Sequence, residues 1–112
     1  MKTDVVVIFV TTKNQAQAKA IAKALLTKKL VACTNILKGI ESLFWWQGKI
    51  DQSKECLLLL KTKKSLFAQV SQTIKQHHSY QIPEIIALPV LVGQKDYMDW
   101  VKACCSLPQA RY

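Results

Sequence analysis

Two adjacent histidines, His77 and His78, are the side chains most suited to metal chemistry, because imidazole nitrogens bind transition metals. They end a segment with helical periodicity, and neighbouring residues on a helix point about 100° apart. The pair therefore needs a further ligand, for example from another subunit, to chelate one ion. The alternative is structural: His77 packs beneath the helix, and His78 caps its end, where a cation also suits the helix dipole.

A second candidate cluster consists of Trp46, Lys61, Tyr80 and Glu84, which fall near the ends of predicted strands. An ammonium, a phenol and a carboxylate beside an indole could hold a small polar ligand. The same groups could equally form a hydrogen-bond network that fixes the register between subunits. Both interpretations remain open from the residues alone.

Nucleophilic catalysis has little support, because no serine or cysteine is visibly paired with a histidine. The cysteines Cys33, Cys56, Cys104 and Cys105 form no C-x-x-C motif, so neither a zinc ribbon nor a thioredoxin-type site is indicated. We expect reduced, free thiols, including the adjacent pair near the end of the chain. The protein is not expected to be an enzyme or to require a cofactor.

The composition indicates one globular domain over residues 1–112, with no apolar run approaching the roughly 18 residues of a membrane span. The apolar run Val5 to Val10 lacks a cleavage site, so we do not expect a signal peptide. We therefore expect a cytoplasmic location. The net charge is +9, but Arg111 is the one arginine. Lysines lack the planar fork that reads bases, so a solvated lysine surface is favoured and a nucleic-acid partner is not.

The first half of the chain predicts strands around one helix. Val5 to Thr11 is β-branched and apolar, and Gln15 to Lys29 carries a helical apolar stripe, capped by Asn14 or Thr12. The stripe consists of Ala18, Ile21, Ala22 and Leu25. Extended segments follow at 30–37, 40–50 and 55–62. We expect the turn between the last two at Asp51 to Lys54 rather than at Gln47-Gly48, with Gly48 as a bulge.

The second half predicts a helix over 63–78, a strand over 84–92 and a short helix over 95–104. Phe67, Val70, Ile74 and His77 form the inward stripe of the first helix. Pro89 cannot donate to a ladder, which places the strand at a sheet edge or at a bulge. The face expected to pack in the last helix consists of Tyr97, Trp100, Val101 and Cys104.

This order predicts an α+β, ferredoxin-like βαββαβ fold: an antiparallel sheet with two long helices on one face, plus a short C-terminal helix. The helices leave the other face of the sheet bare. Yet the strand over 55–62 is apolar on both sides, with Leu57 and Leu59 opposing Leu58 and Leu60. A monomer would expose a large apolar patch, so we expect an oligomer.

The chain resembles the CutA family along most of its length. The resemblance rests on Ala32-Cys33-Thr34-Asn35, Ser42 to Lys49 (SLFWWQGK), Lys61-Thr62, His78-Ser79-Tyr80, Pro83-Glu84-Ile85-Ile86 and Tyr97-Met98-Asp99-Trp100. It implies a homotrimer in which a long hairpin reaches a neighbour, and a role in divalent-cation tolerance. Some members bind copper through a strand cysteine and two adjacent histidines. This chain has the two histidines as His77 and His78, but it has Val10 at the position of the cysteine. Cu²⁺ or another divalent cation is therefore a candidate ligand, but the site would lack the thiolate ligand.

Two other functions share this element order. An acylphosphatase needs an arginine in a glycine-rich loop after the first strand, whereas Thr11 to Gln15 contains neither residue. An RNA-binding sheet needs exposed aromatic side chains on its middle strands. Those strands offer Phe9 and a run of leucines, which an oligomer would cover.

Overall fold

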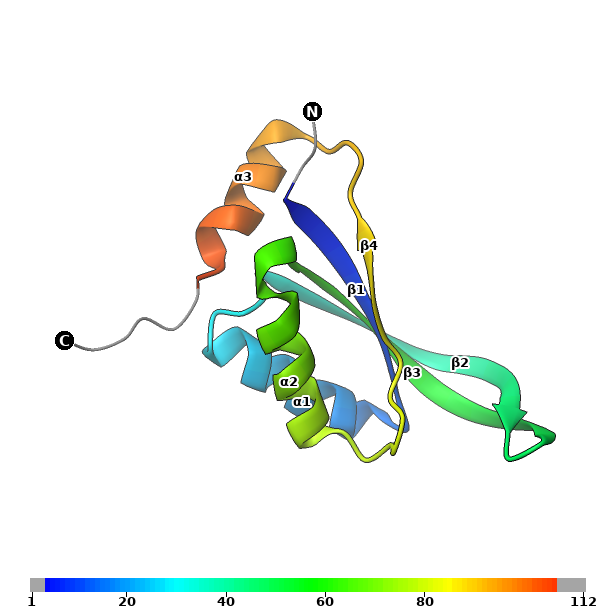
Figure 1. Cartoon of the computed structure of the whole chain (residues 1–112). Coiled ribbons are helices and arrows are strands. Elements are labelled where there is room, and N and C mark those ends of the chain that lie inside the picture. Colours follow the sequence, from blue (N-terminus) through cyan, green and yellow to red (C-terminus); the bar gives the residue numbers. More distant parts are fainter. Residues whose placement is uncertain (1–3, 107–112) are drawn as a thin grey trace.

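The computed structural model describes residues 4–106, and it has the predicted ferredoxin-like α+β arrangement (Figure 1). Its elements are β1 (Val5–Thr12), α1 (Gln15–Thr27), β2 (Cys33–Trp46), β3 (Lys49–Lys63), α2 (Phe67–His77), β4 (Ile85–Pro89) and α3 (Lys95–Cys104). A single 3-10 turn, Lys64–Leu66, leads into α2. The sheet is antiparallel with the order β2-β3-β1-β4, and α1 and α2 pack on one face. Arg111 lies outside the described residues.

The core lies between the sheet and the two long helices. Alternate residues of β1, including Val6, Ile8 and Val10, are buried toward the helices, as period-2 alternation requires. The predicted α1 stripe is confirmed, because its buried residues are Ala18, Ile21, Ala22 and Leu25. Each large apolar side chain buried here contributes roughly 1.5–3 kcal/mol. Asn14 caps α1, and its side chain accepts from the Gln17 amide at 2.9 Å.

The hairpin turn is at Gln47-Gly48, so the expected turn at Asp51 to Lys54 is wrong. Gln47 and Gly48 have φ angles of 50° and 79°. Positive φ at both central residues is typical of the two-residue type I′ turn, whose twist matches that of the flanking strands. The polar run 51–54 is instead paired strand. The irregularity falls between Leu37 and Ile40, where Gly39 has φ 71°, and it bends one continuous β2.

The β2–β3 hairpin projects beyond the rest of the sheet (Figure 1). The pairing of β1 with β3 ends at Thr12 and Cys56. Beyond that point, the described strands β2 and β3 pair with each other alone, from Ile40–Glu55 to Trp46–Lys49. The hairpin therefore exposes apolar side chains on both faces, among them Leu43, Trp45 and Ile50.

The second half of the chain follows the predicted order of elements, with corrections to their bounds and faces. The helix predicted over 63–78 is the 3-10 turn followed by α2. The strand β4 is an edge strand, as Pro89 predicted, but it begins at Ile85 rather than at Glu84 and ends at Pro89 rather than at Val92. Buried residues of α2 include Val70 and Ile74, but His77 is exposed, so its expected place beneath the helix is wrong. Its ring instead lies against its own helix, with Nδ1 3.0 Å from the Thr73 carbonyl.

The packing face of α3 matches the prediction only in part. Val101 is buried as predicted, and Met98 is buried with it against Val5. Cys104 is half-buried, whereas Tyr97 and Trp100 are exposed. The helix α3 packs over the start of β1. Its buried positions are 98 and 101, so the buried face is centred about one residue further along the helix than predicted. Among residues 4–106, no helix is both long enough and apolar enough to span a bilayer.

The sheet face opposite α1 and α2 is largely open, as the pattern of leucines predicted. The register places Ile86, Phe9 and Leu59 in one row across β4, β1 and β3. Leu88 and Val7 stand in the next row, beside Lys61. Ile86 and Leu88 are about half exposed, at 51% and 49%. At one end of the sheet, Val5 is covered by α3.

Candidate functional site

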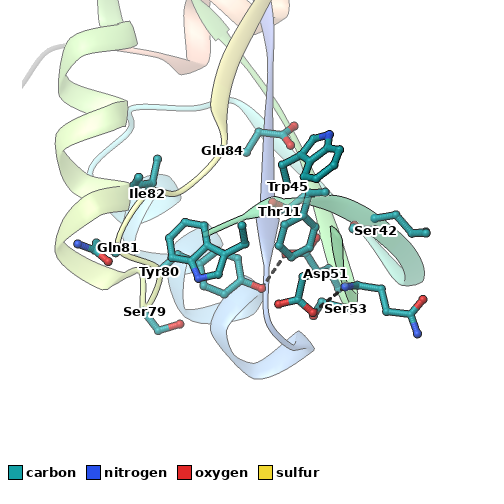
Figure 2. Close-up of a pocket in the computed structure, with 15 residues that line it drawn as sticks. Thr11, Ser42, Trp45, Asp51, Ser53, Ser79, Tyr80, Gln81, Ile82 and Glu84 are labelled. Atoms are coloured by element: carbon teal, nitrogen blue, oxygen red, sulfur yellow. Dashed lines mark hydrogen bonds between the residues drawn. The ribbon is translucent and has the colours of Figure 1, made fainter. Parts of the chain in front are cut away.

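A groove of about 970 Å³ runs between the β2–β3 hairpin and the loop that joins α2 to β4. It begins where β1 ends, because the hairpin continues past Thr12 without a third strand beside it. Figure 2 shows Ser79, Tyr80, Gln81 and Ile82 along one wall and Asp51 and Ser53 along the other. Side chains of this loop thus lie beside the hairpin where a third strand would otherwise pair with it. An open space remains between the loop and the hairpin.

The central contact in the groove joins Tyr80 to Glu55. The Tyr80 hydroxyl donates to Oε2 of Glu55 at 2.7 Å, and the Glu55 residue is only 7% exposed. Burial raises the pKa of Tyr80 to about 12, and the hydrogen bond with Glu55 and its negative charge add to the rise, whereas a hydrogen bond with Ser53 opposes it. The phenol is therefore held neutral and acts as a donor rather than as a base.

His78 fixes the loop that carries Tyr80. Its Nδ1 accepts from the Tyr80 amide at 3.0 Å, so the proton of the neutral ring is on Nε2. That nitrogen donates to the Thr11 carbonyl at 2.7 Å, and the His78 and Tyr80 ring centroids are 4.7 Å apart. His78 ends α2, as expected of a cap, but it does so by tying the loop to β1.

The two histidines do not fit a chelating copper site in this chain. Both ring nitrogens of His78 are engaged, and Nδ1 of His77 is 3.0 Å from the Thr73 carbonyl. Val10, where the resemblance led us to look for a cysteine ligand, is fully buried toward the helices. Within residues 4–106 no group of three or more histidine, cysteine or acidic side chains could hold a metal ion. A site on His77 and His78 stays a prediction without geometric support.

The structure brings together three of the four side chains in the second predicted cluster. Trp46, Tyr80 and Glu84 line the groove, but Lys61 does not. Lys61 is six residues from Glu55 along β3, which is about 20 Å, and its Nζ donates to Oδ1 of Asn35 on the open sheet face. Sequence reasoning missed Glu55, the actual partner of Tyr80. Its signal was an acidic residue at the very start of the buried run Cys56 to Leu60.

The remaining candidate chemistries find no matching geometry in the described residues. The loop after β1, where an acylphosphatase would bind phosphate, forms the N-terminal cap of α1 instead. Thr12 Oγ1 donates to the Asn14 carbonyl, and the Asn14 side chain caps the helix. The four cysteines are free, as expected, and Cys56 and Cys105 are buried. Burial raises the pKa of the Cys105 thiol, which suits a structural role rather than a reactive one.

The profile of the family described as "CutA1 divalent ion tolerance protein" matches residues 6–104. The chain belongs to the CutA family. It is 40% identical over 96 residues to the divalent-cation tolerance protein CutA of Thermus thermophilus, which covers 86% of this chain and 93% of that protein. It is 41% identical over 97 residues to the chloroplastic protein CutA 1 of Oryza sativa subsp. japonica.

The rice match covers 87% of this chain and 55% of the relative, so the chain spans about half the length of that protein. Among solved structures, the periplasmic divalent cation tolerance protein CutA of Archaeoglobus fulgidus superposes with a TM-score of 0.87. It is 41% identical, and the match covers 89% of this chain and 97% of that one. CutA names describe tolerance to divalent cations and not a reaction.

These relatives correct the expected cytoplasmic location. The rice protein is described as chloroplastic and the Archaeoglobus protein as periplasmic, so a purely cytoplasmic location is not supported. The expectation rested on free thiols and on the absence of a recognisable signal. Neither property fixes the compartment, because the same fold serves in several of them.

Proposed function

We propose that this CutA chain acts in divalent-cation tolerance as a non-catalytic binding protein, which holds a small ligand in the groove beside the β2–β3 hairpin. The observation that carries the proposal is the Tyr80–Glu55 contact. It places a neutral hydroxyl and a buried carboxylate at the floor of an open space of about 970 Å³. A few polar groups that converge in a partly apolar concavity are typical of a ligand site.

A catalytic role is less well supported by the same groove. Its phenol has a pKa of about 12, far above the range useful to a general base near neutral pH. No lining residue is a histidine or a cysteine, and His78, which precedes the lining residue Ser79, has both ring nitrogens engaged by Thr11 and Tyr80. Binding is therefore the function that these side chains support best.

The chain is also proposed to work as a homotrimer. Two separate apolar surfaces support this: the open sheet face with Phe9, Leu59 and Ile86, and the projecting hairpin with Trp45 and Ile50. A monomer would leave both surfaces in water, which costs roughly 25 cal/mol for each Å² of apolar area. A hairpin that extends across to a neighbour would cover them, and it would bring a second chain near the groove.

A copper ion on His77 and His78 is the weaker version of the ligand proposal. It would break the hydrogen bonds of His78 to Thr11 and Tyr80, and it would still need a third ligand from another subunit. The groove needs no such rearrangement to admit a ligand.

The ligand proposal is tested with small aromatic probes and with NMR signals of the tryptophan indole N–H groups. Trp45 and Trp46 line the groove, whereas Trp100 is in α3 and serves as the internal reference. Benzamidinium, benzamide and benzoate are titrated separately at millimolar concentration. At least one probe should shift the signals of Trp45 and Trp46 and leave that of Trp100 unchanged. If no probe moves the groove signals, the groove is not a ligand site for such molecules.

A further inference from the structure

The groove differs in charge from the rest of the molecule. The chain has a net charge of +9, with 16 basic and 7 acidic residues. Yet the charged residues that line the groove are Asp51, Glu55 and Glu84, and no lysine lines it. The lining of the groove is therefore negative although the chain as a whole is positive. This negative lining would attract a cation, whereas it would not favour a neutral or anionic ligand.

The three carboxylates have no cationic partner among residues 4–106. The ion pairs in that range are formed by Asp99 with Lys95 at 2.7 Å and with Lys102 at 3.9 Å, both in α3. Glu55 accepts from the neutral Tyr80 hydroxyl, and Asp51 accepts from the Gln52 amide at 2.8 Å. These bonds use only part of the acceptor capacity of each carboxylate, because one carboxylate can accept about four.

Aromatic side chains of the hairpin also line the groove. Phe44, Trp45 and Trp46 all line it, and Trp45 is 73% exposed. Figure 2 shows the Glu84 side chain, which comes from the segment before β4, pointing toward the Trp45 ring of the hairpin. A cation over an indole face gains about 0.5–2 kcal/mol, and the gain is larger when the cation is poorly hydrated. Carboxylates beside indoles are therefore a combination that selects for organic cations.

A bare metal ion fits this groove less well than an organic cation does. Hard metal ions need several oxygen ligands converging within about 2.6 Å, and the described residues form no group able to supply them. A large, weakly hydrated cation needs only a carboxylate at hydrogen-bond distance and a ring face. Guanidinium and amidinium groups supply planar N–H donors that match a carboxylate.

We infer that the groove ligand is an organic cation of the guanidinium, amidinium or ammonium class, held by the carboxylates of Glu55 and Glu84 and packed against Trp45 and Trp46. The inference rests on the proposed function, since it names the charge class of the ligand for the same groove. The Tyr80 hydroxyl, which also lines the groove, fixes the position of the Glu55 carboxylate by its hydrogen bond.

The probe series separates this inference from the proposed function. Benzamidinium, benzamide and benzoate share nearly the same shape and differ in charge. Benzamidinium should bind at least about tenfold more tightly than benzamide, which corresponds to about 1.4 kcal/mol, and benzoate should bind least. If benzamide or benzoate binds as well as benzamidinium, the groove is a ligand site and the cation inference is overturned. If none binds, both fail.

Variants inside the groove, each with a matched control outside it, test which carboxylate and which indole contact the cation. Glu84→Gln should weaken benzamidinium binding several-fold and leave benzamide binding unchanged, and Trp45→Leu should do the same through the lost ring face. Both side chains are exposed within the single chain, so both variants should fold. Because Trp45 is also on the proposed trimer surface, the Trp45→Leu variant is compared with wild type only where the two have the same mass in solution. Glu41→Gln removes a carboxylate from the same hairpin outside the groove, and Trp100→Leu removes an exposed indole elsewhere. An equal loss of affinity in Glu41→Gln and Glu84→Gln would mean that only net charge matters, and it would refute the inference.

A further titration with the wild-type oligomer distinguishes two sources of the cation: a free small ligand, or a lysine side chain of a neighbouring subunit. Free agmatine, which has a guanidinium group and no aromatic ring, should compete with benzamidinium for the groove. A neighbouring subunit could instead place one of its own lysines there. In that case, benzamidinium would bind only when the oligomer is dissociated, and a failure to bind the intact oligomer would overturn the small-ligand inference.

Discussion

The Tyr80 hydroxyl lies 2.7 Å from Oε2 of Glu55, and this one contact joins the loop before β4 to the β2–β3 hairpin. The loop is held from the other side by His78, which bonds to the Thr11 carbonyl and to the Tyr80 amide. Three segments far apart in the sequence therefore meet through two side chains. Both walls of the groove are therefore connected at this point.

Tyr80→Phe should lower the free energy of unfolding by about 1–3 kcal/mol, because it leaves the buried Glu55 carboxylate without its donor. The measurement is urea unfolding followed by circular dichroism. Tyr97→Phe is the matched control, because Tyr97 is 42% exposed and its removal should cost less. An equal loss in both variants would show that the Tyr80–Glu55 bond contributes little.

Alkaline pH should weaken the fold through Tyr80. Its pKa is about 12 in the folded chain, against 10.0 for an ordinary tyrosine. The folded state therefore keeps its proton where the unfolded state loses it, so this contribution is full below pH 10 and is lost as the pH rises toward 12. Absorbance of tyrosinate at 295 nm should show one phenol that titrates near pH 12 in wild type and is missing in Tyr80→Phe. A late titration that persists in the variant would assign it to another tyrosine.

The sequence predicted the features that depend on local periodicity. The stripe Ala18, Ile21, Ala22 and Leu25 repeats every three or four residues, so the buried face of α1 could be identified without knowing what it packs against. The edge position of β4 followed from Pro89, because its missing N–H is a property of the residue itself.

Features that depend on distant pairing could not be predicted in the same way. Tyr80 and Glu55 are 25 residues apart, and only the register that ends β1 at Thr12 and Cys56 leaves space for Tyr80 beside Glu55. Lys61 appeared to belong to the cluster because it is near a strand end in sequence, but the register places it beside Val7. The turn was misplaced because a polar run is a weaker signal than a glycine that follows a residue able to adopt positive φ.

The hairpin turn offers a test of this reading. Gly48→Ala should lower stability by about 1 kcal/mol, because alanine is strained at φ 79° although its Cβ would meet no atom within 4 Å. Gln47→Asn should raise stability slightly, since asparagine tolerates positive φ better than glutamine does. The same replacement at Gln52, within β3, should not be stabilising. A Gln47→Asn variant no more stable than Gln52→Asn would contradict the type I′ assignment.

Copper binding should not depend on the adjacent histidines. Isothermal titration of Cu²⁺ into wild type and into a His77→Ala, His78→Ala double variant should give the same affinity, because the engaged nitrogens leave no chelating pair. A His77→Ala single variant separates the loss of a ligand from any loosening of the loop held by His78. Affinity that falls tenfold or more in both variants would restore the metal site.

The central claim is that other copies of this chain cover the apolar sheet face and the projecting hairpin. The most direct measurement is the mass in solution, by light scattering or sedimentation at micromolar concentration and physiological salt. We predict a single species of three chains of 12.7 kDa each, unchanged on tenfold dilution. A species with the mass of one chain, with Ile86 and Leu88 in contact with water, would contradict the account.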